Sequence, residues 1–123
     1  MTPATAKPKS GPPIEAPMSP SPAEEDPLKT VTQERLDRYL RLTETALEKA
    51  RVVAPERSFA AKIADSYRDM AQRYYQDAHS FAEKGDRVNA FACVNYAHGW
   101  LDAGARLGVF DTGGDDELFT LLE

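Results

Sequence analysis

The fold is decided by the stretch FAEKGDRVNA (residues 81–90), which separates two long helical patterns. Lys84 suits the last turn of one helix, Gly85 suits the left-handed position after it, and the Asp86 carboxylate can cap the helix that follows. Helices joined by so short a connection lie antiparallel to each other. The stretch therefore predicts a helical hairpin.

Upstream of this break, Ser58 is the expected N-cap of a helix. Apolar residues then recur at steps of three and four, which marks one face of a helix. The stripe consists of Phe59, Ile63, Tyr67, Met70, Tyr74, Ala78 and Phe81, and it is widened by Ala60, Ala64, Ala71 and Ala82. We predict that this face packs into the core.

Downstream of the break, a helix is expected from Arg87 to Leu107. Its core face consists of Ala90, Val94, Ala97, Leu101, Ala105 and Gly108. A second stripe of Tyr96, Trp100 and Leu107 lies about a third of a turn away at 100° per residue. A helix that is apolar around more than half its girth is no simple surface helix. We expect it to be central, and we interpret Tyr96, Trp100 and Leu107 as candidate interface residues.

A further helix is expected near the start of the domain, with Thr30 or Thr32 as its N-cap. Its core face consists of Leu36, Leu40, Thr43, Leu47, Ala50 and Ala54. Pro55 should end it, because the residue before a proline avoids helical angles. After Gly113-Gly114, Asp115 or Asp116 can cap a short C-terminal helix that runs through Glu117, Leu118, Phe119, Leu121 and Leu122.

The first 28 residues have a different composition from the rest. Eight of the nine prolines lie between Pro3 and Pro27, and proline interrupts both helices and sheets. Too little apolar surface is present to offset the entropy lost on ordering. We therefore predict an all-α chain: a disordered Pro-rich tail over residues 1–28, then an antiparallel three-helix bundle with a short C-terminal helix over residues 29–123.

Charge and composition exclude several classes of protein. A net charge of −5 argues against a nucleic-acid binder, whose surface usually carries a basic excess. No stretch is long and apolar enough to cross a bilayer, and the N-terminus lacks the apolar core of a signal peptide. The single cysteine, Cys93, fits a reducing compartment. We expect a cytoplasmic protein without membrane contact.

Several stretches carry a family resemblance. They are YLRLTETALEKA (39–50), AP (54–55), SFAAKIA (58–64), FAEKGDRVNA (81–90) and NYAHGWLDAGARLG (95–108). Together they resemble the small archaeal family catalogued as domain of unknown function 357. The resemblance covers most of residues 28–110 and leaves the Pro-rich tail outside. It implies an archaeal source and a compact three-helix fold, and it implies no activity.

The most distinctive polar cluster is Asn95, His98, Asp102 and Arg106 on the third helix. The first three fall within about 60° of one another, and Arg106 follows one turn later. The i, i+4 pair of His98 and Asp102 can orient an imidazole, and Gly99 leaves a dent beside it. The four residues form a candidate ligand-binding edge, with an edge-packed histidine and a surface Asp102–Arg106 ion pair as the structural alternative.

No catalytic residue, metal site or cofactor fingerprint emerges from the sequence. Zinc needs three or four ligands, and only His98 and Asp102 are suitably placed. Our first hypothesis is a non-enzymatic helical module that binds a protein partner or self-associates. The alternative is a small-ligand, nucleotide or RNA-binding protein that uses the His98–Asp102–Arg106 edge. Burial separates the two, because a covered edge favours interaction and an open, concave edge favours a ligand.

Overall fold

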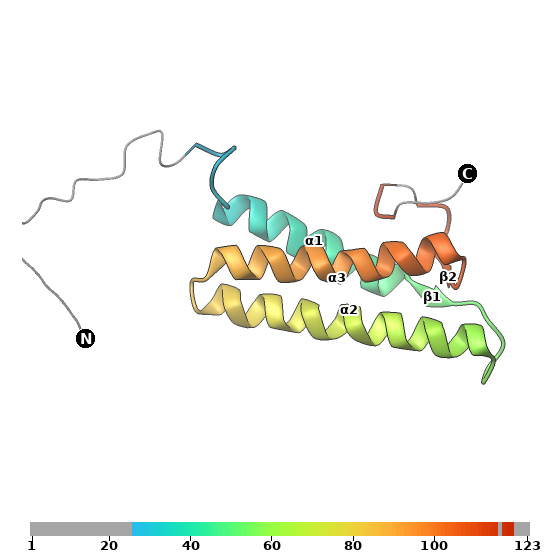
Figure 1. The fold of residues 1–123 in the computed structure, drawn as a ribbon. Coiled ribbons are helices and arrows are strands. Elements are labelled where there is room, and N and C mark those ends of the chain that lie inside the picture. The colour runs from blue at the N-terminus through green and yellow to red at the C-terminus, as the bar shows by residue number, and fades with distance from the viewer. Residues whose placement is uncertain (1–25, 116, 120–123) are drawn as a thin grey trace, which may run out of the picture. The chain divides into compact units, whose positions relative to one another are not determined.

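Three helices and one short strand pair make up the described part of the chain (Figure 1). The computed structural model describes residues 26–115 and 117–119. In chain order the elements are α1 (Gln33–Lys49), β1 (Arg51–Val52), α2 (Phe59–Glu83), α3 (Arg87–Leu107) and β2 (Phe110–Asp111). The chain divides into compact units of residues 1–30 and 31–123, and every element belongs to the second. Disorder was predicted for residues 1–28. Residues 1–25 lie outside the described residues, whereas residues 26–28 belong to a turn in which the Lys29 N–H donates to the Asp26 carbonyl at 2.8 Å.

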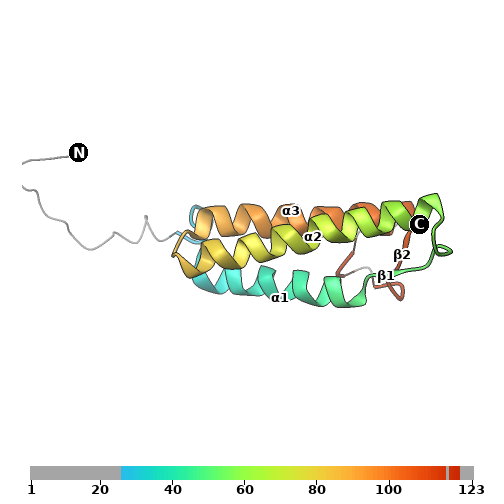
Figure 2. The ribbon, with the colours of Figure 1, turned by 90° about the horizontal axis from the view of Figure 1, so that it is seen from below.

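The helical hairpin forms where the sequence predicts it. The Ser58 hydroxyl accepts a hydrogen bond from the Ala61 N–H at 3.1 Å and so starts α2. At the break Gly85 adopts φ +82°, and the Asp86 carboxylate accepts from the Asn89 N–H at 3.0 Å at the start of α3. The two helices run side by side in opposite directions in both views (Figures 1 and 2), and their contact is the most extensive of any pair.

The face that α2 buries agrees with the predicted one in Ala64, Ala71 and Ala78 but not in its large residues. Its buried residues are small: Ala61, Ala64, Ala71 and Ala78. The predicted large residues lie at the margin, where Tyr67 and Tyr74 are half-buried and Phe59 is 78% exposed. Ala78 of α2 lies in one buried cluster with Ala90 and Val94 of α3, and small residues let two helices approach closely. Close approach leaves no room between the helices for aromatic rings, so the rings line the edge of the contact.

The start of α1 is fixed by Thr32, whose hydroxyl accepts from the Arg35 N–H at 3.1 Å. The helix ends at Lys49, so the predicted continuation to Ala54 is wrong. Ala50 is already extended, with ψ 107°. The guanidinium of Arg68 on α2 donates to the Leu47 carbonyl at 2.7 Å and thereby satisfies one of the terminal carbonyls of α1.

The residues expected to finish the first helix form a strand instead. Arg51 pairs with Asp111 and Val52 with Phe110 in an antiparallel two-stranded sheet. Val53 extends the contact, because its N–H donates to the Val109 carbonyl at 3.3 Å. β-Branched residues favour extended backbone, and the partner strand supplies hydrogen bonds that a local pattern does not reveal.

The chain reverses direction after α3. Gly108 was predicted on the core face, but it is the left-handed C-cap of the helix, with φ +83°. Asp115 then caps as expected, since its Oδ1 accepts from the N–H groups of Glu117 and Leu118. Residues 117–119 form a single turn where a short helix was predicted. Residues 116 and 120–123 lie outside the described residues.

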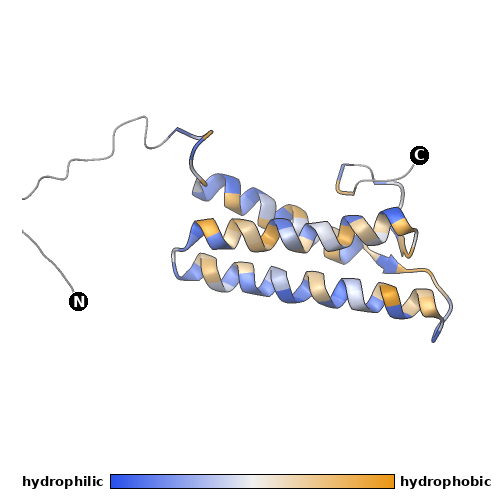
Figure 3. Ribbon diagram, in the orientation of Figure 1, coloured by the Kyte–Doolittle hydropathy of each residue, from blue (hydrophilic) through white to orange (hydrophobic). Residues whose placement is uncertain are grey.

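Helix α3 is the central element, as predicted. It contributes Ala90 and Val94 to one buried cluster and Leu101 and Ala105 to the other. In Figure 3 it is mostly pale or orange along its length, whereas blue residues are frequent on α1 and on the outer side of α2. Among the described helices, none has the length and apolar character that crossing a membrane requires.

Candidate functional site

His98 is the point at which α1, α3 and the C-terminal residues meet. Its Nδ1 lies 3.0 Å from the hydroxyl of Thr43 on α1, and its Nε2 lies 2.6 Å from the backbone oxygen of Leu118. Thr43 is 2% exposed. The imidazole therefore links segments that are 55 and 20 residues away along the chain.

The contacts of His98 fix where its proton lies. A carbonyl oxygen only accepts, so Nε2 carries the hydrogen and donates it to Leu118. In the neutral ring Nδ1 is then an acceptor, and the Thr43 hydroxyl donates to it. Both ring nitrogens are thus engaged within the chain, and the ring is held by Thr43 and Leu118 together.

Thr43, His98 and Asp102 have the order of a hydroxyl–imidazole–carboxylate triad, but not its geometry. Asp102 Oδ1 is 4.0 Å from Nε2, which exceeds hydrogen-bond distance. The Nε2 hydrogen points to the Leu118 carbonyl instead. A triad needs the carboxylate on the ring nitrogen opposite the hydroxyl and a nucleophile that substrate can reach. This arrangement orients a ring and does not activate a hydroxyl.

A pocket of about 320 Å³ lies beside the imidazole. Its lining consists of Tyr39, Leu42, Thr43, Asn95, His98, Gly99, Asp102, Glu117 and Leu118. The structure therefore brings together three of the four predicted ligand residues. The fourth, Arg106, is exposed and is not part of the lining. The ionised groups of the pocket wall are acidic.

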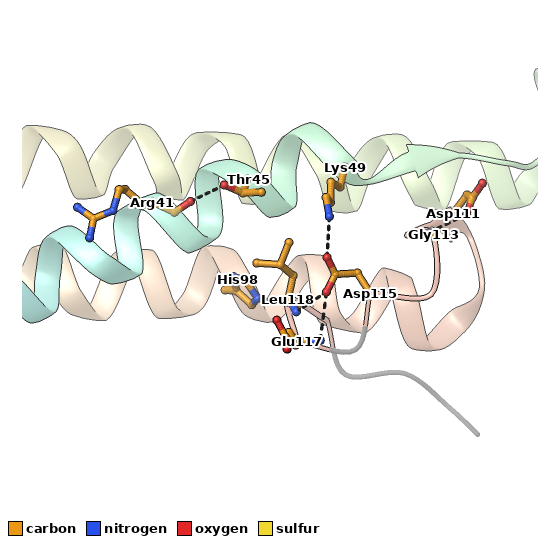
Figure 4. Close-up of polar contacts among 9 residues, drawn as sticks. All are labelled: Arg41, Thr45, Lys49, His98, Asp111, Gly113, Asp115, Glu117 and Leu118. Atoms are coloured by element: carbon orange, nitrogen blue, oxygen red, sulfur yellow. Dashed lines mark hydrogen bonds and ion pairs between the residues drawn. The ribbon is translucent and has the colours of Figure 1, made fainter.

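The C-terminal segment, Asp115 and residues 117–119, covers part of the groove between α1 and α3. Lys49 Nζ reaches Asp115 Oδ2 at 2.7 Å (Figure 4). The hydrogen bond from Lys49 lowers the pKa of Asp115, and the Leu118 N–H adds to this effect. Phe119 is 2% exposed and packs with core residues of α1 and α3. The predicted edge is therefore covered in part and hollowed in part.

The predicted interface residues lie on the other side of α3. Tyr96 is 51% exposed, Leu107 is 58% exposed and Trp100 is half-buried. Ring contacts connect this stripe to α2: Tyr74–Tyr96 at 4.5 Å, Tyr96–Trp100 at 6.0 Å and Tyr67–Trp100 at 5.0 Å between centroids. We call Tyr67, Tyr74, Tyr96 and Trp100 the aromatic edge.

Burial of the Trp100 side chain has a cost in folding free energy. Its indole N–H is buried, and no acceptor among the described residues bonds to it. A buried donor left without a partner costs about 1–3 kcal/mol. The ring lies against Tyr67 and Tyr96 and packs on the core, contacts that offset part of this cost.

Sequence reasoning missed four participants in the site. Thr43 was assigned only to the core face, and Lys49, Glu117 and Leu118 were given no role in it. Their sequence distance from His98 leaves no local signal. Within residues 26–115 and 117–119, no group of three or more His, Cys, Asp or Glu side chains is placed to hold a metal ion.

Comparison with known families assigns the domain. The model of a protein family of unknown function, DUF357, matches residues 38–110, which is more than half of the chain. The chain belongs to the DUF357 family. No curated protein and no solved structure matches it. The DUF357 region contains α2, α3 and most of α1 together with the aromatic edge, and it ends before the C-terminal segment.

Proposed function

We propose that this DUF357 protein is an antiparallel three-helix bundle that acts without catalysis, as an interaction module that self-associates. The observation that carries the proposal is the aromatic edge between α2 and α3. Aromatic rings provide the largest apolar contact area of any side chains, and Tyr and Trp are enriched at interfaces. Here they line the margin of the contact, where water still reaches them.

The edge continues beyond the four rings. Leu107 extends it on α3, and the 78% exposed Phe59 extends it on α2. From Phe59 to Tyr74 the stripe follows α2 for about 22 Å at 1.5 Å per residue, which is about four helical turns. A stripe along one helical hairpin can meet the same stripe of a second copy across a two-fold axis, which is the commonest symmetry of homo-oligomers.

Sedimentation velocity over a wide concentration range tests this proposal. We expect the wild type to form a dimer as its concentration rises, and we expect Tyr96→Glu to remain monomeric because a carboxylate would be buried without a partner. Leu107→Glu should have the same effect. Trp100→Ala is a poorer probe, because Trp100 also packs against the core.

Val88→Glu is the matched control for these variants. Val88 is 71% exposed on the same helix, but it points about 80° away from Tyr96. It should leave the dimer intact. A wild type that stays monomeric at every concentration, or a Tyr96→Glu variant that dimerises normally, contradicts the proposal.

The pocket beside His98 supports a second candidate function, the binding of a small ligand. Its volume lies within the usual range for such sites. Asp102 and Glu117 are the ionised groups of its wall, so charge favours an amine over a phosphate or nucleotide. Amines should raise the melting temperature of the wild type and of an Asp65→Asn control, whose residue is exposed on α2. An undiminished response in Asp102→Asn would contradict this function.

A further inference from the structure

The groove between α1 and α3 is occupied by residues that follow the helical domain. Phe119 fills its apolar part and packs in one cluster with Ala46 and Leu47 of α1 and with Leu101 and Ala105 of α3. At 2% exposure the phenyl ring is as buried as the core of the domain. The groove is thus a socket that accepts an aromatic side chain from outside the helices.

Polar groups of the groove recognise the same short segment. Lys49 contacts the Asp115 carboxylate at 2.7 Å, and His98 Nε2 donates to the Leu118 carbonyl at 2.6 Å. Figure 4 shows Lys49 extending from α1 to Asp115 and Leu118 lying beside His98. Three groups of the segment thus have separate partners: Lys49 contacts the carboxylate, His98 bonds to the main-chain carbonyl, and the apolar cluster surrounds the aromatic ring. Anchor side chains combined with main-chain hydrogen bonds are typical of peptide recognition.

The segment is joined to the domain by a pliable connection. Gly113 and Gly114 have φ values of +70° and +74° and are exposed. Glycine readily changes between such conformations. The Lys49–Asp115 ion pair is partly exposed, and exposed pairs contribute little to stability. The segment is therefore held by Phe119, by the bond to His98 and by Asp115, whose carboxylate also accepts from the N–H groups of Glu117 and Leu118.

The DUF357 match includes the residues that form the groove but not the C-terminal segment that fills it. Thr43, Lys49, His98 and the apolar wall lie within residues 38–110, which the DUF357 model matches. The C-terminal segment lies outside that match. The groove therefore lies within the region that the family model matches, whereas the segment that fills it lies outside that region.

We propose that the α1/α3 groove is a docking site for a short segment of a partner protein, and that the chain's own C-terminal segment competes for it. The partner segment has a carboxylate four residues before an aromatic residue, with an aliphatic residue between them, as in Asp115, Leu118 and Phe119. Lys49 selects the acid, His98 binds the main chain and the apolar socket takes the ring. This surface is independent of the aromatic edge, because His98 and Tyr96 point about 160° apart around α3.

A labelled peptide GGDDELFTLL, which has the sequence of residues 113–122, tests the groove in the full-length protein by fluorescence anisotropy. The wild type should bind it weakly, because a tethered competitor acts at an effective concentration in the millimolar range. Phe119→Ala removes the anchor of the competitor, and we expect it to bind the peptide at least about tenfold more tightly. The same peptide with alanine in place of its phenylalanine should not bind.

Two further variants make the result specific. In the Phe119→Ala background, Lys49→Glu should abolish the gain in affinity, whereas Arg51→Glu should preserve it. Arg51 is a neighbouring cation whose ion-pair partner is Asp111, outside the C-terminal segment. If Phe119→Ala loses helical content, Asp115→Ala replaces it, because this change weakens the competitor without opening the core.

Equally weak binding by the wild type, Phe119→Ala and Asp115→Ala would overturn the proposal. A dimer of Asp115→Ala in which each copy's segment fills the other's groove would overturn it as well, since the groove would then serve a second copy. Tighter 1:1 binding that depends on Lys49 supports the proposal, whatever the aromatic edge does.

Discussion

The two sides of α3 are covered by different kinds of contact. On the His98 side the contacts are polar, both ring nitrogens are bonded, and α1 and the C-terminal segment cover them. On the Tyr96 side the contacts are made by rings against α2, and half of the Tyr96 surface remains open. The His98 side is covered in part by other segments of the chain, whereas the Tyr96 side leaves part of its aromatic surface exposed. The difference is the basis of the association that we propose at the aromatic edge.

The largest change in stability is expected at Gly104, one of two glycines within α3. The other, Gly99, provides a comparison on the same helix. A Cβ atom at Gly104 would overlap the ring of Phe110. Overpacking of this kind costs about 1–3 kcal/mol, so Gly104→Ala should lower the melting temperature by roughly 4–8 °C per kcal/mol. Thermal unfolding followed by circular dichroism measures the change.

Gly99→Ala is the matched control. A Cβ at Gly99 meets nothing within 4 Å, and alanine favours a helix interior by up to about 1 kcal/mol over glycine. The variant should therefore be as stable as the wild type or more stable. A melting temperature that falls equally in both variants would show that the packing of Phe110 is not what requires Gly104.

The hydrogen bond between Thr43 and His98 gives a smaller effect. Thr43→Val keeps the shape of the side chain but leaves Nδ1 of His98 without its partner, which should cost about 1 kcal/mol. Thr45→Val is the control on the same helix, because the exposed Thr45 hydroxyl bonds only to the Arg41 carbonyl one turn earlier (Figure 4). Chemical denaturation should detect a change in the first variant alone. Equal midpoints for the two variants would mean that the imidazole is not held by Thr43.

Acid titration gives the smallest effect. The pKa of Asp115 is lowered by Lys49 and by backbone N–H groups, and the pKa of Asp111 is lowered by the Gly113 N–H and by Arg51. A carboxyl whose pKa is lower in the folded state stabilises it above the unfolded pKa of about 4, and this contribution is lost as the pH falls through the folded pKa. The melting temperature should therefore begin to fall below about pH 4. Asp115→Asn should be less stable than the wild type at pH 7 and should converge with it in acid; a constant difference would contradict this.

The sequence predicted those elements whose signals are local. Ser58, Gly85 and Asp86 set the ends of α2 and the start of α3, because capping involves residues within one turn. The end of α1 could not be predicted, since Ala50 and Arg51 extend to meet Asp111, which lies 60 residues away.

The candidate site likewise combines residues with a local sequence signal and residues that only the fold brings together. Asn95, His98 and Asp102, which were grouped by their spacing on one helix, line the same pocket. Thr43 and Leu118 were missed, because only the packing of α1 and the path after β2 bring them to His98. The buried face of α2 was predicted in part. Ala64, Ala71 and Ala78 are buried as expected, whereas the large residues of the same face, such as Tyr67 and Tyr74, lie at the margin of the core, which side-chain size alone does not reveal.

Trp100 is the only tryptophan of the chain, and its position makes it a spectroscopic reporter. Its ring lies 5.0 Å from Tyr67 and 6.0 Å from Tyr96, so light absorbed by these tyrosines is readily transferred to it. Its emission responds to the polarity of the aromatic edge, whereas the phenyl ring of Phe119 is silent at the same wavelengths. A shift of the emission to the blue with rising concentration would therefore report association at the edge without a label.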